Sequence, residues 1–294
     1  MKKNINFDHI ERILDKLNIK NNNIYLGIDY FVLIKILKPK NINYFEVTDI
    51  ILDFFLKKIV KFGNLIIPVF NFDCIHKKKF NIIKSPGQTG VLGNLLLKKY
   101  PHLRTDHPLY SFLCFGKNSK KYRKLKNLNG TAKNSIWKYF IDDEFELVSL
   151  GHHYSRSLTH IHYIENLLDV DYRFNLKFPL IYTNLNNISL KKTYSFFARK
   201  REVCDFSGMT KKCDKLFLNE GISSFYKYRN SICFKLNIKE ASNLFYSDLK
   251  KNSENLISYI RPNKPNHDVL CSYNGSISEL EDRYLKKSYK KFKV

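Results

Sequence analysis

The feature that most constrains the fold is a run of six residues, 65–70, in which every position is apolar. A strand that is apolar on both sides is covered on both faces of its sheet. The preceding segment, 45–62, has apolar residues at helical spacing and stops at Gly63, which we expect to occupy the C′ position of a helix. A helix followed by a doubly covered strand predicts an α/β sandwich.

The rest of the chain repeats this alternation of patterns. Helical spacing predicts helices over residues 1–20, 90–99, 159–168, 205–217 and 238–252. Apolar or β-rich runs predict strands over residues 24–37 (with the exit of the strand), 110–115, 145–150, 180–182 and 195–198. We find no internal repeat or linker, so we expect one domain over 1–294, with a core of about residues 20–260 and a Lys-rich tail of about 260–294.

Charge and composition limit the partners. Lys and Arg number 51 against 27 Asp and Glu, a formal charge of +24, which favours anionic ligands and opposes polycationic ones. The basic residues are spread along the chain and form no recognition helix or finger, so we expect no nucleic-acid partner. Self-association as a homodimer stays open.

Other classes are disfavoured by what the sequence lacks. Its apolar runs fall well short of the ~20 residues that span a bilayer, and the N-terminal segment has no apolar signal region, so we expect a cytoplasmic protein. Six cysteines without C-x-x-C spacing indicate buried thiols rather than disulfides or a zinc site. Glycine-rich nucleotide loops and the G-x-S-x-G motif of a serine nucleophile are also missing.

Chemistry-bearing residues crowd the segment after Gly151, which contains four of the nine histidines: 152, 153, 160 and 162. Within the expected helix, Thr159, His162 and Glu165 are three residues apart and share one face. A carboxylate beside an imidazole fixes its tautomer, so this pair can act as a general base and its orienter, or be a structural pair. Thr159 can cap the helix or donate to an oxyanion or thiolate. The i, i+4 histidine pair of helical zinc sites is missing, so we expect no metal.

Five segments in order resemble the aminoglycoside 3-N-acetyltransferases, also called the antibiotic N-acetyltransferase family. The segments are Gly63-Asn64-Leu65-Ile66-Ile67-Pro68-Val69-Phe70, Ser85-Pro86-Gly87-Gln88-Thr89-Gly90, Arg104-Thr105-Asp106-His107-Pro108-Leu109-Tyr110-Ser111-Phe112, Leu150-Gly151 with Thr159-His160-Ile161-His162-Tyr163-Ile164-Glu165, and Asp171-Tyr172-Arg173. The resemblance implies a three-layer α/β/α sandwich with a central mixed sheet and a C-terminal elaboration. It also implies transfer of the acetyl group of acetyl-CoA to a primary amine of an amino sugar.

The same resemblance implies catalytic roles. By motif, His162 is the general base that deprotonates the attacking amine, Glu165 orients it, and Thr159 lies near the thioester and its sulfur. A positioned base contributes ~10²- to 10⁴-fold to such a reaction.

Binding roles follow in the same way. Ser85, Thr89 and the backbone at Gly90 are expected to meet the CoA phosphates, because helix N-termini favour anions. His107 and Ser111 are expected to line the substrate cleft, although His107 could equally stabilise its loop.

Two departures from the family pattern are visible. The segment 26–33 carries Asp29 where relatives have a hydroxyl-bearing "v-H-s-S-l" motif, and 36–41 replaces a Gly-rich loop. These changes leave a non-catalytic relative as an alternative. Because an aminoglycoside is polycationic and the chain is strongly basic, we expect an anionic amino sugar, such as a nucleotide-linked sugar of a surface polysaccharide, with aminoglycoside resistance as the alternative.

Overall fold

A computed structural model describes residues 5, 7–38, 43–60, 62–200, 206–229, 231–251 and 256–260; the Lys-rich tail expected after 260 lies outside them. Within this part of the chain, six strands form the central sheet. In spatial order they are β4 (Phe112–Gly116), β2 (Asn64–Pro68), β1 (Asn23–Ile28), β5 (Glu146–Leu150), β10 (Ser231–Asn237) and β9 (Ser223–Tyr228). The three middle strands β2, β1 and β5 run parallel, and the outer strands are antiparallel to their neighbours. The predicted mixed sheet is confirmed.

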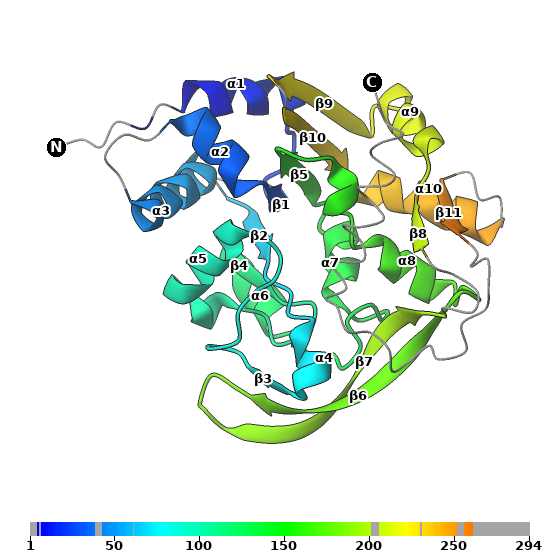
Figure 1. Ribbon diagram of the computed structural model, residues 1–294. Helices are drawn as coiled ribbons and strands as arrows, with labels where there is room; N and C mark the ends of the chain where they lie inside the picture. The colour runs from blue at the N-terminus through cyan, green and yellow to red at the C-terminus, as the bar shows by residue number, and fades with distance from the viewer. Residues whose placement is uncertain are drawn as a thin grey trace.

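Helices cover both faces of this sheet (Figure 1). One face packs against α1 (Asp8–Leu17), α2 (Tyr30–Leu37), α3 (Tyr44–Phe55) and α5 (Val91–Lys99). The other face packs against α7 (Ile136–Asp142), α8 (Ile161–Leu167) and α10 (Ile238–Lys250). Side chains alternate along the strands: Leu65 and Ile67 of β2 belong to the first core, and Ile66 belongs to the second. The three-layer α/β/α architecture is therefore confirmed.

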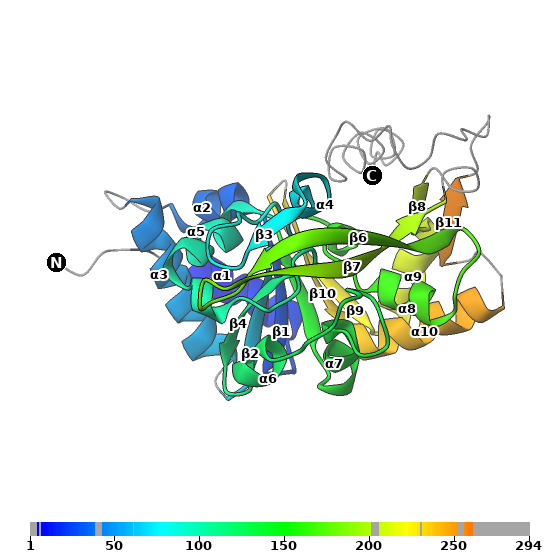
Figure 2. The same cartoon turned by 90° about the horizontal axis from the view of Figure 1, so that it is seen from below.

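Smaller elements surround this sandwich. A long hairpin of β6 (Arg173–Thr183) and β7 (Ser189–Arg199) runs along the molecule, with the short strand β3 (Lys79–Asn81) at its edge (Figure 2). Strands β8 (Phe206–Met209) and β11 (Ile257–Ile260) pair near α9 (Lys211–Asn219). The remaining described elements are short: η1 (Leu56–Val60), α4 (Asp73–Lys77), η2 (Pro101–Leu103), α6 (Ser119–Arg123) and η3 (Tyr154–Arg156).

Three local predictions were wrong. Segment 24–37 is a strand only to Ile28, because the Asp29 side chain accepts hydrogen bonds from two backbone amides and caps α2. Gly63 is not a C′ residue; it is required because a Cβ there would lie 2.0 Å from the carbonyl oxygen of Asn22. In segment 205–217 a strand precedes the helix, which begins only at Lys211.

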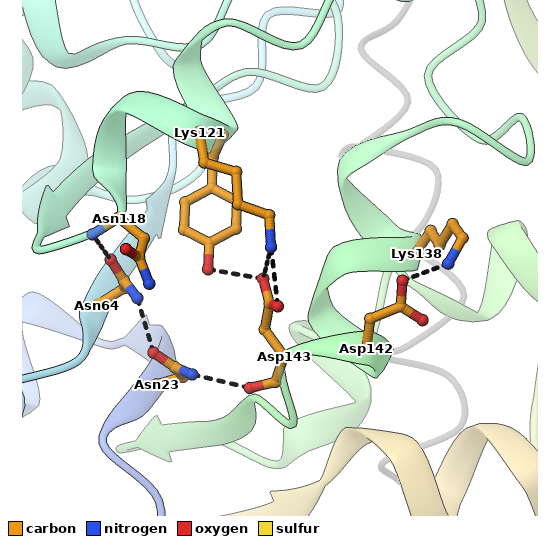
Figure 3. A network of polar contacts seen from close by, with 8 residues as sticks. Asn23, Asn64, Asn118, Lys121, Lys138, Asp142 and Asp143 are labelled. Atoms are coloured by element: carbon orange, nitrogen blue, oxygen red, sulfur yellow. Dashed lines mark hydrogen bonds and ion pairs between the residues drawn. The ribbon is translucent and has the colours of Figure 1, made fainter.

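The amino ends of the parallel strands are tied together by polar side chains (Figure 3). Asn64 donates to Asn23 and accepts from the backbone amide of Asn118, both at 2.8 Å, and Asn23 donates to the carbonyl of Asp143. The Asp143 carboxylate in turn accepts from Lys121. These bonds fasten together the loops at this edge of the sheet.

Candidate active site

Three loops meet at the carboxyl edge of β1, β2 and β5. The chain passes from β1 to β2 on one side of β1 and later to β5 on its other side, and such a reversal in strand order is where open α/β sheets bind ligands. Gly27 on β1 permits the approach of the loop after β5, since a Cβ there would lie 2.2 Å from Ser157 Oγ. Gly151, with φ +95°, turns β5 toward Asp29, and Gly90 faces the carbonyl of Ile28.

His162 and Glu165 form a hydrogen-bonded pair on α8. The distance from His162 Nδ1 to Glu165 Oε2 is 2.6 Å, as the three-residue spacing predicted. A carboxylate only accepts hydrogen bonds, so Nδ1 carries the proton and the lone pair lies on Nε2. The Glu165 side chain is 1% exposed and that of His162 is 19% exposed. The pair therefore presents the accepting imidazole, and not the carboxylate, toward the surface.

Two further residues hold the Glu165 carboxylate. The Tyr172 hydroxyl donates to Oε1 at 2.8 Å, and Arg173 Nε lies 2.8 Å from Oε2. Burial by itself raises the pKa of Glu165, but the charge of Arg173 and the contact with His162 outweigh it, so the pKa lies below its usual value. Glu165 is accordingly ionised at neutral pH.

Thr159 lies one turn before His162, and its carbonyl accepts from the His162 backbone amide at 3.1 Å. It is not the helix cap, because His160 occupies the N-cap position of α8. Its half-buried hydroxyl hydrogen-bonds the Tyr25 hydroxyl of β1. Burial raises the pKa of Tyr25 well above its usual value, so this phenol stays protonated. The contact with Tyr25 thus ties Thr159, one turn before His162, to the sheet.

The other clustered histidines have different surroundings. His160 is fully buried and faces the Phe245 ring, and burial lowers its pKa to about 3. His152 contacts Ser157 Oγ at 2.9 Å, and burial lowers its pKa to about 4. His153 lies 3.2 Å from Asp214 on α9. His160 and His152 are therefore neutral groups, and the face of α8 that carries Glu165 presents His162.

The predicted CoA-phosphate residues lie in the loop before α5. Thr89 Oγ1 accepts from the Phe70 amide at 3.0 Å, and Ser85 Oγ accepts from the Asn81 amide at 2.9 Å, so both hydroxyls brace the loop. Gly90 has φ +87° and precedes α5 without a side-chain cap. The backbone amides of the first turn of α5 are thus what this loop offers to an anion.

Arg104 lies beneath that loop and is 1% exposed. Its guanidinium donates to the carbonyls of Val69 (2.9 Å) and Ser85 and to Ser111 Oγ (3.0 Å). Burial lowers the pKa of Arg104 to about 9, which leaves it protonated at neutral pH. Ser111 is fully buried and its hydroxyl donates to the carbonyl of Val69 at 2.8 Å, so it braces the backbone that follows β2.

His107 is also beneath the surface. Its Nδ1 accepts from the Tyr110 amide at 3.0 Å, and burial lowers its pKa to about 3. It borders a cavity of about 10 Å³, the size of one water molecule. A role for His107 and Ser111 in lining the substrate cleft stays a prediction.

Residues 47–244 match the family model of the aminoglycoside 3-N-acetyltransferases. The chain belongs to this family. It is therefore an acyltransferase by family, of the class that uses acetyl-CoA to acetylate amines. No curated sequence matches it.

Solved structures share the fold of this family member. Aminoglycoside acetyltransferase AAC(3)-IIb is 13% identical with a TM-score of 0.65, and the match covers 83% of this chain and 96% of that chain. AAC-IIIb in its binary complex with CoASH is 14% identical with a TM-score of 0.65, over 86% and 97% of the two chains. The YokD protein from Bacillus subtilis is 17% identical with a TM-score of 0.61, over 85% and 100%.

Membrane-spanning helices and metal-binding clusters are both absent from the part of this acetyltransferase family member that the structure describes. No helix in that part of the chain is long and apolar enough to cross a membrane. The same residues contain no group of three or more His, Cys, Asp or Glu side chains that could hold a metal ion. The four cysteines described there, at 74, 114, 213 and 233, are buried and free, as the sequence predicted.

Sequence reasoning gave no role to three residues that build the site. Tyr25 lies on a strand more than 130 residues before Thr159, so no local pattern could connect them. Tyr172 and Arg173 were noted only within a segment that resembles the family. A hydroxyl and a cation a few residues after a carboxylate on a helix could, however, have indicated that they contact it. The expected departure at Asp29 is present, and its carboxylate serves α2 as the N-cap.

Proposed function

We propose that this protein transfers the acetyl group of acetyl-CoA to the primary amine of an anionic amino sugar, with His162 as the general base. The observation that carries the proposal is the His162–Glu165 pair, because it fixes the tautomer that leaves Nε2 able to accept a proton. The loop that leads to α8 leaves β5 at the carboxyl edge of the parallel strands, where α/β proteins bind ligands, and this agrees with the role.

Each residue has a task in this reaction. His162 Nε2 takes the proton from the amine as the nitrogen attacks the thioester carbonyl, the C–N bond forms and the C–S bond breaks. Glu165 stabilises the imidazolium that results, and the proton then leaves with the CoA thiol. The Thr159 hydroxyl, held by Tyr25, donates to the developing oxyanion or to the departing sulfur. No covalent enzyme intermediate is needed, since the thioester is already activated.

The acyl donor is proposed to lie along the loop before α5. Gly90 and the uncapped first turn of α5 offer backbone amides to the CoA phosphates, while Ser85 and Thr89 hold the loop in shape. The CoASH bound to AAC-IIIb, which has the same fold, supports CoA binding here. The reaction is placed in the cytoplasm, where acetyl-CoA is available.

The acceptor is argued from charge. The chain carries +24, and the β6–β7 hairpin contributes Lys177, Lys191 and Lys192 without an acidic residue between Arg173 and Arg199. Such a surface attracts a phosphate-bearing sugar and repels a polycation. An aminoglycoside is the second candidate acceptor, favoured by the substrate of the family to which the chain belongs.

The test is thiol release from acetyl-CoA by the purified protein with two acceptors, a nucleotide-linked amino sugar and an aminoglycoside, and in a control without an acceptor. We expect the sugar nucleotide to give the highest kcat/KM, and faster turnover of the aminoglycoside would overturn the assignment of the acceptor. His162→Gln should lower kcat by about 10²- to 10⁴-fold. The control His76→Gln changes an exposed histidine on α4 and should keep full activity. Full activity of His162→Gln would overturn the assignment of the base.

A further inference from the structure

The Glu165 carboxylate is shared between two nitrogen groups. One oxygen, Oε2, lies 2.6 Å from His162 Nδ1 and 2.8 Å from Arg173 Nε, so these two nitrogens are at most about 5.4 Å apart. The other oxygen, Oε1, is held by the uncharged Tyr172 hydroxyl at 2.8 Å. The arrangement is buried, with side-chain exposures of 1% for Glu165 and 6% for Arg173. Charges that are this close together and this well shielded from water interact strongly.

The sum of these charges decides whether His162 can work as a base. With Arg173 present, the guanidinium and the carboxylate form an ion pair whose charges cancel, so the imidazole lies beside a pair with no net charge. Without Arg173, a buried negative charge would lie 2.6 Å from the imidazole and would draw a proton onto it. A histidine that is already protonated cannot accept the proton of the amine.

We infer that Arg173 is a positioning residue that holds His162 in its unprotonated state by compensating the charge of Glu165. This inference rests on the proposed function, in which His162 is the base. Arg173 also donates to the carbonyl of Phe197 at 3.2 Å, so the β6–β7 hairpin fixes where its charge lies. The titratable and charged groups near His162 include Glu165, which it contacts, His160, and the Tyr172 and Arg173 partners of Glu165. Arg199 lies opposite Arg173 in the hairpin.

The experiment is an NMR titration of the histidine Cε1 protons in the full chain, with the His162 signal assigned by its loss in His162→Gln. Arg173→Gln removes the charge, and we expect the titration midpoint of His162 to rise by about 1 to 2 pH units, the effect of one unit charge at this distance. Arg173→Lys keeps the charge and should restore the midpoint. Tyr172→Phe is the matched control, because it removes a contact to the same carboxylate without changing the charge, and it should move the midpoint by less than about 0.5.

Two more variants test the opposite change, in which the negative charge of Glu165 is removed. Glu165→Gln leaves Arg173 uncompensated and should lower the midpoint of His162, whereas Glu165→Gln combined with Arg173→Gln should return it between the two single variants. A purely structural role for Arg173 predicts unfolding or lost turnover without this pattern. The acid limb of the kcat profile should move to higher pH in Arg173→Gln by the same amount as the NMR midpoint.

The outcomes separate the two proposals. An unchanged or lowered midpoint in a folded Arg173→Gln variant overturns the inference about Arg173, whatever the activity. Should that variant fail to fold, an unchanged midpoint in Glu165→Gln overturns it instead. Full turnover by His162→Gln overturns the proposed base and leaves the titration result intact.

Discussion

Arg104→Met should destabilise the protein strongly, although Arg104 touches no expected substrate. The methionine fills much of the same space but leaves the carbonyls of Val69 and Ser85 without the guanidinium that donates to them. A hydrogen bond from a charged group contributes about 1.5 to 3 kcal/mol. The cost of burying the charge offsets part of this, so we take the lower end for each of the two bonds and expect a loss of about 3 to 4 kcal/mol.

Urea unfolding monitored by fluorescence measures this loss, because Trp137 is the single tryptophan and is fully buried. With an m-value of about 3 kcal/mol/M, the midpoint should fall by about 1 M. Arg12→Met on α1 is the matched control, since Arg12 is exposed, and it should stay within about 0.5 kcal/mol of the parent. If Arg104→Met were as stable as Arg12→Met, the reasoning that Arg104 fastens the loop before α5 would be refuted.

Three further variants test His160 and Thr159. His160 is charged in the unfolded chain below its free pKa of about 6.5 but stays neutral in the folded protein down to about pH 3, so its contribution to stability is lost as the pH falls through this window. The free energy of unfolding should therefore fall by about 2 kcal/mol less between pH 7.5 and 5.0 in His160→Phe than in the parent protein. Urea unfolding at the two pH values measures this difference, and an equal fall in both proteins would contradict the prediction. Thr159→Val removes the hydroxyl beside Tyr25 and should lower kcat by about 100-fold, while Thr159→Ser should retain most activity; a loss confined to stability would instead assign Thr159 a structural role.

Local patterns determined much of the secondary structure. The apolar positions predicted at the start of the chain, Ile10, Ile13, Leu14 and Leu17, are the buried face of α1. The apolar run at 65–70 contains most of β2, which ends at Pro68 and is covered by helices on both sides. Such predictions succeed because periodicity reports burial directly. They failed at 24–37, where the strand ends at Ile28 and the Asp29 side chain caps a helix within a mostly apolar run.

The same distinction applies to the site. The sequence alone determined the contact between His162 and Glu165, because residues three apart on a helix face one another. It could not show that His160 points into the core or that Ser111 is fully buried, since burial depends on the packing of distant elements.

Only the tertiary structure brought Arg173 and Tyr25 to this pair. The start of β6 places a cation against Glu165, and β1 places a hydroxyl against Thr159. The effect of a charge or a phenol on a neighbouring group depends on the distance between them. Distances between separate elements are set by how the sheet and the helices pack. The sequence therefore determined that an imidazole and a carboxylate are neighbours on one helix, and the packing of the fold decided which charged and hydroxyl groups surround them.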